Sequence, residues 1–223
     1  MTLQFEPSAS AHHRDFLVEA IMSAEQVPSG LSMYEVIFGM TCDEVREFLR
    51  EALSADMSGR PLSLSSFRLV TDGDRPVGCC ASWVESIESM ASGAWIAMLL
   101  SRHLGVSRFR SCGTAIRSLA DAAPKRSPGA LQLESFFVLP EYRGRGVARR
   151  LITGCLSLAP VTVAKAEISL LIENTPALAA YSGAGFVECW RSPIASGEFF
   201  SRTRSSGFLQ LQKLKADDFR EVR

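Results

Sequence analysis

The stretch that decides the fold is residues 136–148, which read Phe-Phe-Val-Leu-Pro-Glu-Tyr-Arg-Gly-Arg-Gly-Val-Ala. It joins the end of an apolar strand to a short glycine-containing loop and then to the start of an amphipathic helix. The first N–H groups of a helix have no partner inside the helix, and the helix dipole adds partial positive charge there. Glycines allow several of these groups to converge on an anion, and Arg143 and Arg145 add positive charge. The stretch therefore predicts a loop that binds a pyrophosphate.

Two common nucleotide-binding loops do not fit this stretch. A Walker loop ends in Gly-Lys-Ser/Thr, which is absent here. The dinucleotide fingerprint needs a third glycine where Arg149 stands, and it normally lies early in a βαβ unit. Neither a Walker nucleotide triphosphatase nor a nicotinamide-dependent enzyme is therefore expected.

The loop instead resembles the pyrophosphate loop of the GNAT N-acetyltransferases. Residues 143–148 match the signature Arg/Gln-x-x-Gly-x-Gly/Ala of that family, with alanine at the last position. A second segment, Asn174-Thr175-Pro176-Ala177 with Tyr181 and Gly185-Phe186, resembles the family pattern Asn-x-x-Ala-x-x-x-Tyr-x-x-x-Gly-Phe. The two motifs occur in the order of that family and cover roughly residues 131–191.

The resemblance implies a GNAT-like acyl-CoA N-acyltransferase fold of the mixed α/β (α+β) class. Such a fold has a mostly antiparallel central sheet, splayed between the fourth and fifth strands, with helices on both faces. Alternating apolar residues agree with this order and predict strands at 3–5, 67–71, 76–84, 131–139, 166–172, 186–191 and 208–214. We expect residues 1–223 to form one domain, with residues 87–129 inserted between the third and fourth strands.

The resemblance also implies a role for each motif residue. Backbone groups of Phe136 and Val138 would pair with the pantetheine arm of CoA in the splay, and an N–H near Val138 would polarise the thioester carbonyl. Asn174 would hydrogen-bond the pantetheine region, and Tyr181 would protonate the leaving thiolate. The pyrophosphate would be bound by the loop residues Arg143, Gly144, Arg145, Gly146, Val147 and Ala148.

Each of these residues also has a structural interpretation. Tyr181 fits a packed core tyrosine, Asn174 fits a turn residue, and the two loop arginines fit solvated surface charges. We expect Glu134 to be the general base, because strand alternation puts it on the face of Phe136 and Val138. A structural or solvent-exposed role for Glu134 is equally open.

The activity that the resemblance implies is transfer of an acetyl group from acetyl-CoA, as cosubstrate, to a primary amine by direct attack. The acceptor is a small molecule or a peptide or protein, because the segments that select it carry no readable motif. Two alternatives stand beside this function. The chain could be a CoA-binding sensor or scaffold that does not catalyse, or a transferase that uses a longer acyl-CoA.

Composition excludes several other classes. The formal net charge of zero argues against partners such as nucleic acid or a membrane surface. The six cysteines form no C-x-x-C pair, so we expect no metal. No signal peptide is recognisable at the start, and the apolar run 94–100 is far shorter than the ~20 residues that span a bilayer. We therefore expect a cytoplasmic protein.

Residues 87–129 and the acidic N-terminal region bear on the acceptor side. The insert is too long and too apolar for a bare loop, so we expect it to shape the acceptor pocket or to form a homodimer contact. Its basic half would face solvent or an acidic surface. The acids around the predicted helix at 42–53 would attract a cationic amine, or would be ordinary helix-start and solvated acids: Glu35, Asp43, Glu44, Glu47 and Glu51.

Overall fold

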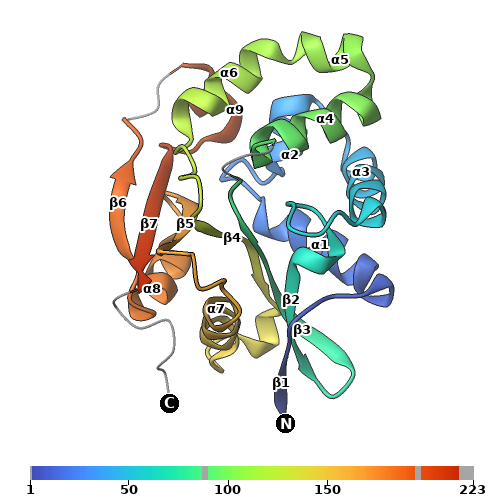
Figure 1. The fold of residues 1–223 in the computed structure, drawn as a ribbon. Coiled ribbons are helices and arrows are strands. Elements are labelled where there is room, and N and C mark those ends of the chain that lie inside the picture. The colour runs from blue at the N-terminus through green and yellow to red at the C-terminus, as the bar shows by residue number, and fades with distance from the viewer. Residues whose placement is uncertain (1, 87–89, 194–196, 216–223) are drawn as a thin grey trace.

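A seven-stranded mixed sheet forms the centre of the molecule (Figure 1). The computed structural model describes residues 2–86, 90–193 and 197–215, so residues 87–89 of the expected insert lie outside it. The strand order is β1-β2-β3-β4-β5-β7-β6, and among the described strands only β4 and β5 run parallel. The strands are β1 (Leu3–Glu6), β2 (Phe67–Asp72), β3 (Arg75–Val84), β4 (Leu131–Val138), β5 (Lys165–Leu171), β6 (Val187–Arg191) and β7 (Phe208–Leu214). The mixed, mostly antiparallel sheet expected from the sequence is confirmed.

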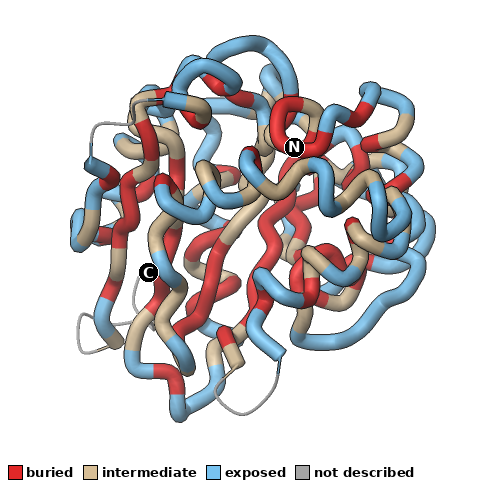
Figure 2. The backbone as a smooth tube through the Cα atoms, turned by 90° about the horizontal axis from the view of Figure 1, so that it is seen from above, coloured by how far each residue is buried: buried red, intermediate tan, exposed pale blue. Residues whose placement is uncertain are grey.

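Helices cover both faces of the sheet, as expected. They are α1 (Arg14–Ala24), α2 (Met33–Phe38), α3 (Cys42–Ala55), α4 (Ser92–Leu104), α5 (Val106–Ser111), α6 (Gly113–Ala122), α7 (Val147–Ser157), α8 (Thr175–Gly183) and α9 (Glu198–Thr203). Helix α1 packs on β4 and β3, whereas α7 packs on the other face of β2, β3 and β4. The adjacent residues Cys79 and Cys80 belong to the two different core clusters. Figure 2 shows the buried residues running along the central strands between these layers.

Local sequence explains where α2 and α3 begin. At each start, the side-chain hydroxyl of the residue before the helix accepts a hydrogen bond from the backbone N–H three residues later. The glutamate at that later position accepts a hydrogen bond, through its carboxylate, from the backbone N–H of the hydroxyl-bearing residue. The pairs are Ser32 with Glu35, at 3.3 and 2.7 Å, and Thr41 with Glu44, at 3.2 and 2.8 Å. The second capping box predicted α3. Helix α2 has the same signature but only six residues, and it was not predicted from the sequence.

Three helices, α4, α5 and α6, lie between β3 and β4 and cross the top of the view in Figure 1. Leu100 of α4 and Ala115 of α6 are buried in the same core cluster as α1 and α3. Arg108 of α5 pairs with Glu44 of α3 at 2.6 Å. The segment therefore completes the core beneath it. Its apolar run lies within α4, and among the described residues no helix has the length and apolar character needed to cross a membrane.

Candidate functional site

Strands β4 and β5 separate partway along their length. In the described part of the chain their pairing covers three residue pairs: Leu131 with Ala166, Gln132 with Glu167, and Leu133 with Ile168. Residues of β4 are buried as far as Leu133 and become partly exposed from Glu134 to Val138. The strand therefore opens to solvent where it leaves its neighbour, which confirms the expected splay between the fourth and fifth strands.

Ser135 interrupts the regular alternation of β4 at this opening. Its φ angle is 50°, a left-handed value that residues other than glycine rarely adopt. The register with β3 shifts at the same place, so that Glu134 lies opposite Ala81 and Phe137 lies opposite Cys79. One extra residue therefore fits into β4, which is a β-bulge.

The bulge changes the face on which Glu134 lies. Cross-strand partners share a face of the sheet, and Ala81 belongs to the core cluster under α1. Phe136 and Val138 instead pack in the cluster under α7 and α8. Our expectation that Glu134 shares a face with Phe136 and Val138 is therefore wrong, because the bulge shifts the two-residue alternation by one position.

On the α1 face, Glu134 belongs to a group of polar residues that we call the α1-side cluster: Glu25, Tyr34, Arg126, Glu134 and Ser135. Arg126 Nε donates to Glu134 Oε1 at 2.7 Å, and Arg126 Nη2 lies 2.5 Å from the same oxygen in an ion pair. Ser135 Oγ donates to Glu25 Oε1 at 3.4 Å. Burial and the neighbouring Glu134 raise the pKa of Glu25 to about 7, against smaller opposing effects of Ser135 and Arg126.

Sequence reasoning missed Glu25, and no local signal marks it. It stands at the end of α1, in no motif, and it reaches β4 only through the fold. Its backbone is held on both sides, because its N–H donates to Ile21 O and its carbonyl accepts from Met33 N, each at 2.9 Å. The residue as a whole is half-buried.

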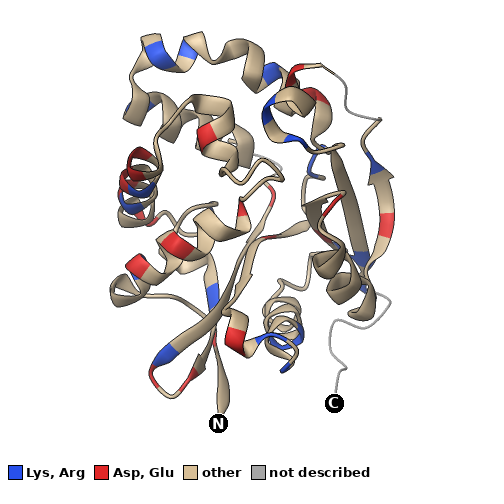
Figure 3. Cartoon of the chain, turned by 180° about the vertical axis from the view of Figure 1, so that it is seen from behind, with Lys and Arg blue, Asp and Glu red and all other residues tan. Residues whose placement is uncertain are grey.

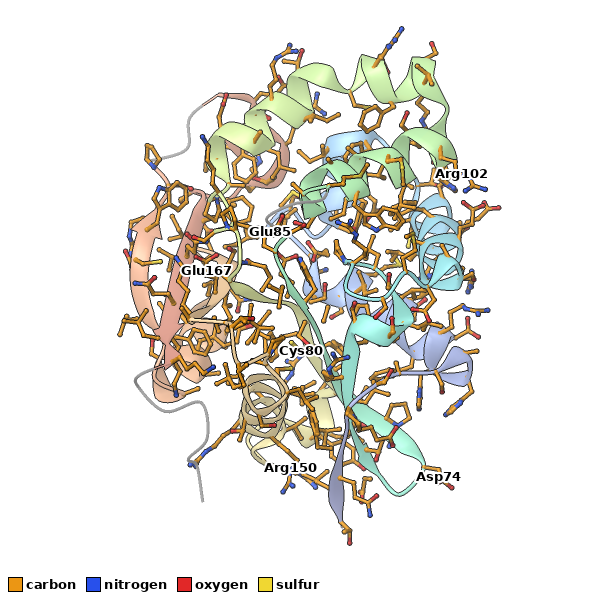
Figure 4. The ribbon with its side chains drawn as sticks, viewed as in Figure 1. Asp74, Cys80, Glu85, Arg102, Arg150 and Glu167 are labelled. Atoms are coloured by element: carbon orange, nitrogen blue, oxygen red, sulfur yellow. The ribbon has the colours of Figure 1, made fainter. Side chains whose placement is uncertain are left out.

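The loop that carries Arg126 is fixed to the sheet by the buried Glu167. This carboxylate accepts from Ser127 N at 3.0 Å and from Gln132 Nε2 at 2.8 Å, and it pairs with Lys165 at 2.8 Å. Figure 4 shows Glu167 on β5 and Glu85, directly after β3, near the same end of the sheet. These contacts position Arg126 beside β4 before any substrate is present.

On the other face, Tyr181 of α8 packs against the open part of β4. Its ring centroid lies 5.2 Å from that of Phe136, and the residue is buried. Its hydroxyl donates to no group among the described residues. Burial, with a smaller contribution from Cys80, raises the pKa of Tyr181, so the phenol is protonated at neutral pH. The side chain is therefore a hydrogen-bond donor at this position.

The glycine-containing loop has the conformation that an anion cradle needs. Gly144 and Gly146 have φ angles of 73° and 79°. Gly146 precedes α7, and no side chain caps the free N–H groups of this helix. In β3, a Cβ at Gly78 would lie 2.7 Å from Val147 Cγ1, so glycine there allows the start of α7 to approach the sheet.

Basic side chains surround the start of α7. Arg143, Arg145, Arg149 and Arg150 are all exposed, and Arg145 also lies over the ring of Tyr142 at 5.5 Å. Figure 3 shows basic residues on this helix, and Figure 4 shows Arg150 at its outer side. The loop therefore combines uncapped N–H groups with accessible positive charge.

Backbone direction places one donor in the splay. Leu139 N–H donates to Val77 O on β3 at 2.9 Å. Successive N–H groups of a strand point to opposite edges, so the N–H of Val138 points to the edge that β5 has left. The Val138 carbonyl accepts from Arg143 Nε at 3.3 Å. Asn174 caps α8 by accepting from Ala177 N at 3.2 Å, which occupies its side-chain oxygen.

Most of the acidic N-terminal residues have structural partners. Glu35 and Glu44 complete capping boxes, and Glu44 also pairs with Arg108. Glu51 pairs with His103 of α4 at 2.8 Å. These contacts favour the structural interpretation of the acids over a negative rim. They also show that Arg108, in the basic half of the insert, pairs with an acid of α3.

Comparison with known proteins bears on this arrangement. A sequence profile of the Acetyltransferase (GNAT) family matches residues 41–186. A comparison with curated protein sequences gave no match. Among solved structures, the chain resembles an N-acetyltransferase from Staphylococcus aureus Mu50, with a TM-score of 0.61 and 15% identity over 94% of this chain and 100% of that one.

Two further solved structures are similar in the same way. One is yncA from Salmonella typhimurium with its cofactor acetyl-CoA, with a TM-score of 0.52 and 12% identity over 96% of this chain and 94% of that one. The other is an acetyltransferase of the GNAT family from Streptococcus pneumoniae, with a TM-score of 0.52 and 11% identity over 96% and 99% of the two chains. At these identities the likeness concerns the fold.

Proposed function

Because the chain belongs to the GNAT acetyltransferase family, we propose that it transfers an acetyl group from acetyl-CoA to a primary amine by direct attack of the amine. The observation that carries this proposal is the uncapped start of α7 beside the open part of β4. Acetyl-CoA carries a diphosphate, which suits the helix start. It also carries a thioester on a flexible pantetheine arm, which suits the open strand. The acceptor amine belongs to a small molecule, a peptide or a protein.

The loop residues would hold the diphosphate of acetyl-CoA. The N–H groups of Val147 and Ala148 point out of the first turn of α7, where the helix dipole favours negative charge. The exposed guanidinium groups of Arg143 and Arg145 lie in the same loop. The pantetheine arm would then lie along Phe136 and Val138, in the place where β5 stops pairing with β4.

Two groups would act on the thioester. The N–H of Val138 would donate to the carbonyl oxygen as negative charge develops there. Tyr181, which is protonated at neutral pH and has an unused hydroxyl, would give its proton to the departing sulfur. Asn174 would contribute its side-chain NH2, because its oxygen already caps α8.

We expect Gly146→Asp to weaken binding of acetyl-CoA about 100-fold or more. Aspartate tolerates a left-handed backbone better than most residues, but its carboxylate would repel the diphosphate and compete for the same N–H groups. Loss of charge-assisted hydrogen bonds, at about 1.5–3 kcal/mol each, accounts for the magnitude. Isothermal titration calorimetry with acetyl-CoA measures the dissociation constant.

Gly39→Asp is the matched control. Gly39 also has a positive φ angle, 59°, and ends α2 on the opposite layer. This variant carries the same backbone cost and the same added charge, and we expect it to bind acetyl-CoA as the parent does. Equal affinities of the parent and Gly146→Asp would remove the loop from the cofactor site.

Catalysis itself is tested with a panel of amines. Purified protein, acetyl-CoA and n-butylamine, benzylamine, 1,4-diaminobutane or an α-amino amide are mixed, and free CoA is measured with a thiol reagent. A transferase releases CoA in an amine-dependent manner, and mass spectrometry finds the acetylated amine. CoA binding without release for any small amine, peptide or protein would favour the sensor or scaffold. Faster release of CoA from a longer acyl-CoA than from acetyl-CoA would favour a transferase that uses the longer acyl group.

A further inference from the structure

We propose that the Glu25 carboxylate takes the proton from the acceptor ammonium at the open part of β4, while Glu134 is held by Arg126 and only positions the site. The acceptor class is then a cationic primary amine that enters from the α1 face. This inference rests on the proposed transferase function and deepens it, because it names the base and the charge of the acceptor.

Geometry separates the two carboxylates of the α1-side cluster. Glu134 is engaged by two nitrogens of Arg126, at 2.7 and 2.5 Å, and that arginine also lies over the ring of Trp83 at 5.8 Å. Glu25 has one weak contact, the 3.4 Å hydrogen bond from Ser135, and it has no ion pair among the described residues. Glu25 is therefore the carboxylate that is available to an incoming ammonium.

The backbone conformation of β4 positions the hydrogen bond between Ser135 and Glu25. Ser135 holds a φ angle of 50° in the middle of a strand, next to the last residues that pair with β5. Such conformations cost energy and gather at functional sites. The bulge turns the Ser135 hydroxyl to Glu25 on the α1 face, while Phe136 faces Tyr181 on the other. The proposed base and the proposed acid are thereby on opposite sides of one strand, with the splay between them.

A third observation points to a ligand at the same place. Tyr34 of α2 is nine-tenths buried, and its hydroxyl makes no hydrogen bond to any described residue. Both Glu25 and Glu134 contribute to raising the pKa of Tyr34, although burial is the larger cause. The Tyr34 hydroxyl can therefore accept a hydrogen bond from an amine bound beside these carboxylates.

Charge selects the acceptor. The ionisable groups that act on Glu25 are Glu134 on β4 and Arg126 in the loop before β4, and Glu25 in turn acts on Tyr34 of α2. When Glu25 is ionised, the two carboxylates and one guanidinium carry a net charge of −1. Glu85 adds no carboxylate that could bind the ammonium, because Ser92 already donates two hydrogen bonds to it, at 2.9 and 2.6 Å. The cluster therefore matches one ammonium group.

The proton balance is complete without another reactant. The ammonium gives one proton to Glu25, which later passes it to water. The nitrogen lone pair forms the C–N bond, and the C–S bond breaks with its electron pair on sulfur. The sulfur gains a proton from Tyr181, and the nitrogen loses a second proton to water, from which Tyr181 is reprotonated. The reaction therefore yields an amide, CoA thiol and one proton.

The test is the pH dependence of kcat/KM with acetyl-CoA and the fastest amine of the panel. For the parent we expect kcat/KM to rise with pH through an apparent pKa of about 7, because Glu25 must be ionised in the free enzyme. Glu25→Gln should lower kcat/KM by ~10²–10⁴-fold and abolish this limb. Acetyl-CoA affinity should stay as in the parent, because Glu25 lies on the opposite face from the CoA loop.

Two charge variants make the test specific. Glu134→Gln removes a negative neighbour of Glu25 and should move the limb to lower pH, whereas Arg126→Gln removes a positive one and should move it to higher pH. A merely structural role for these residues predicts no such opposite shifts. Loss of the limb in Glu134→Gln, with a parent-like limb in Glu25→Gln, would overturn the assignment and make Glu134 the base.

A second readout does not depend on activity. Glu25 has a higher pKa in the folded protein than in the unfolded chain, so its contribution to stability is complete below about pH 4.5 and is lost as pH rises through about 7. Thermal unfolding of Glu25→Gln should therefore lack the parent's decline between pH 5 and 8. An unaltered decline overturns the inference alone. If no acceptor is turned over and the decline with pH is also unaltered in Glu25→Gln, both the transferase function and the assignment of the base are overturned.

Discussion

Tyr181→Phe is expected to lower kcat by ~10²–10⁴-fold while leaving the dissociation constant of acetyl-CoA within a few-fold of the parent value. The substitution removes only the hydroxyl, which has no hydrogen-bond partner among the described residues. The ring stays, and with it the 5.2 Å contact with Phe136. Any loss of rate therefore reports the proton and not the packing. Single-turnover kinetics at saturating acetyl-CoA measures the chemical step.

Tyr142→Phe controls for loss of a phenol in general. Tyr142 donates to Asp72 Oδ2 at 3.0 Å, so its hydroxyl is already engaged at the turn end of the β2–β3 hairpin. At saturating acetyl-CoA we expect this variant to keep the parent kcat. If Tyr181→Phe turns over at the parent rate under conditions where chemistry is rate-limiting, Tyr181 is a packed core residue, as its structural interpretation holds.

Leu100→Ala is expected to lower the free energy of unfolding by about 2–5 kcal/mol. Leu100 is 2% exposed in α4 and belongs to the core cluster under α1 and α3. Its truncation leaves a cavity in a layer to which the N-terminal helices and α6 also contribute. In a chain of this size the loss corresponds to roughly 5–15 °C in melting temperature. Chemical denaturation gives the free energy, and calorimetry gives the midpoint.

Met98→Ala is the matched control on the same helix. Met98 is 44% exposed, and both substitutions replace a good helix former by alanine. We expect a change within about 0.5 kcal/mol. Similar stabilities of Leu100→Ala and the parent would mean that the segment between β3 and β4 is separable from the core. We propose the opposite, because Leu100 and Ala115 are buried in that core and Arg126 reaches Glu134.

The sequence alone determined the features that depend on neighbours along the chain. The glycines at 144 and 146, followed by an amphipathic helix, predicted an uncapped helix start, and both residues have the positive φ angles that such a turn requires. Thr41 and Glu44 predicted the start of α3. These signals work because capping and turn geometry involve residues three or four positions apart. The family signature added the splay between β4 and β5.

Tertiary structure decided the acceptor side of the site. Ser135 and Glu25 lie 110 positions apart in the sequence, and their contact exists only because α1 packs on β4. The alternation rule assigned Glu134 to the wrong face, because a bulge depends on how two strands register and leaves no mark in the residue pattern. Only contacts between distant segments fix that register, and they decide which carboxylate is paired and which is available.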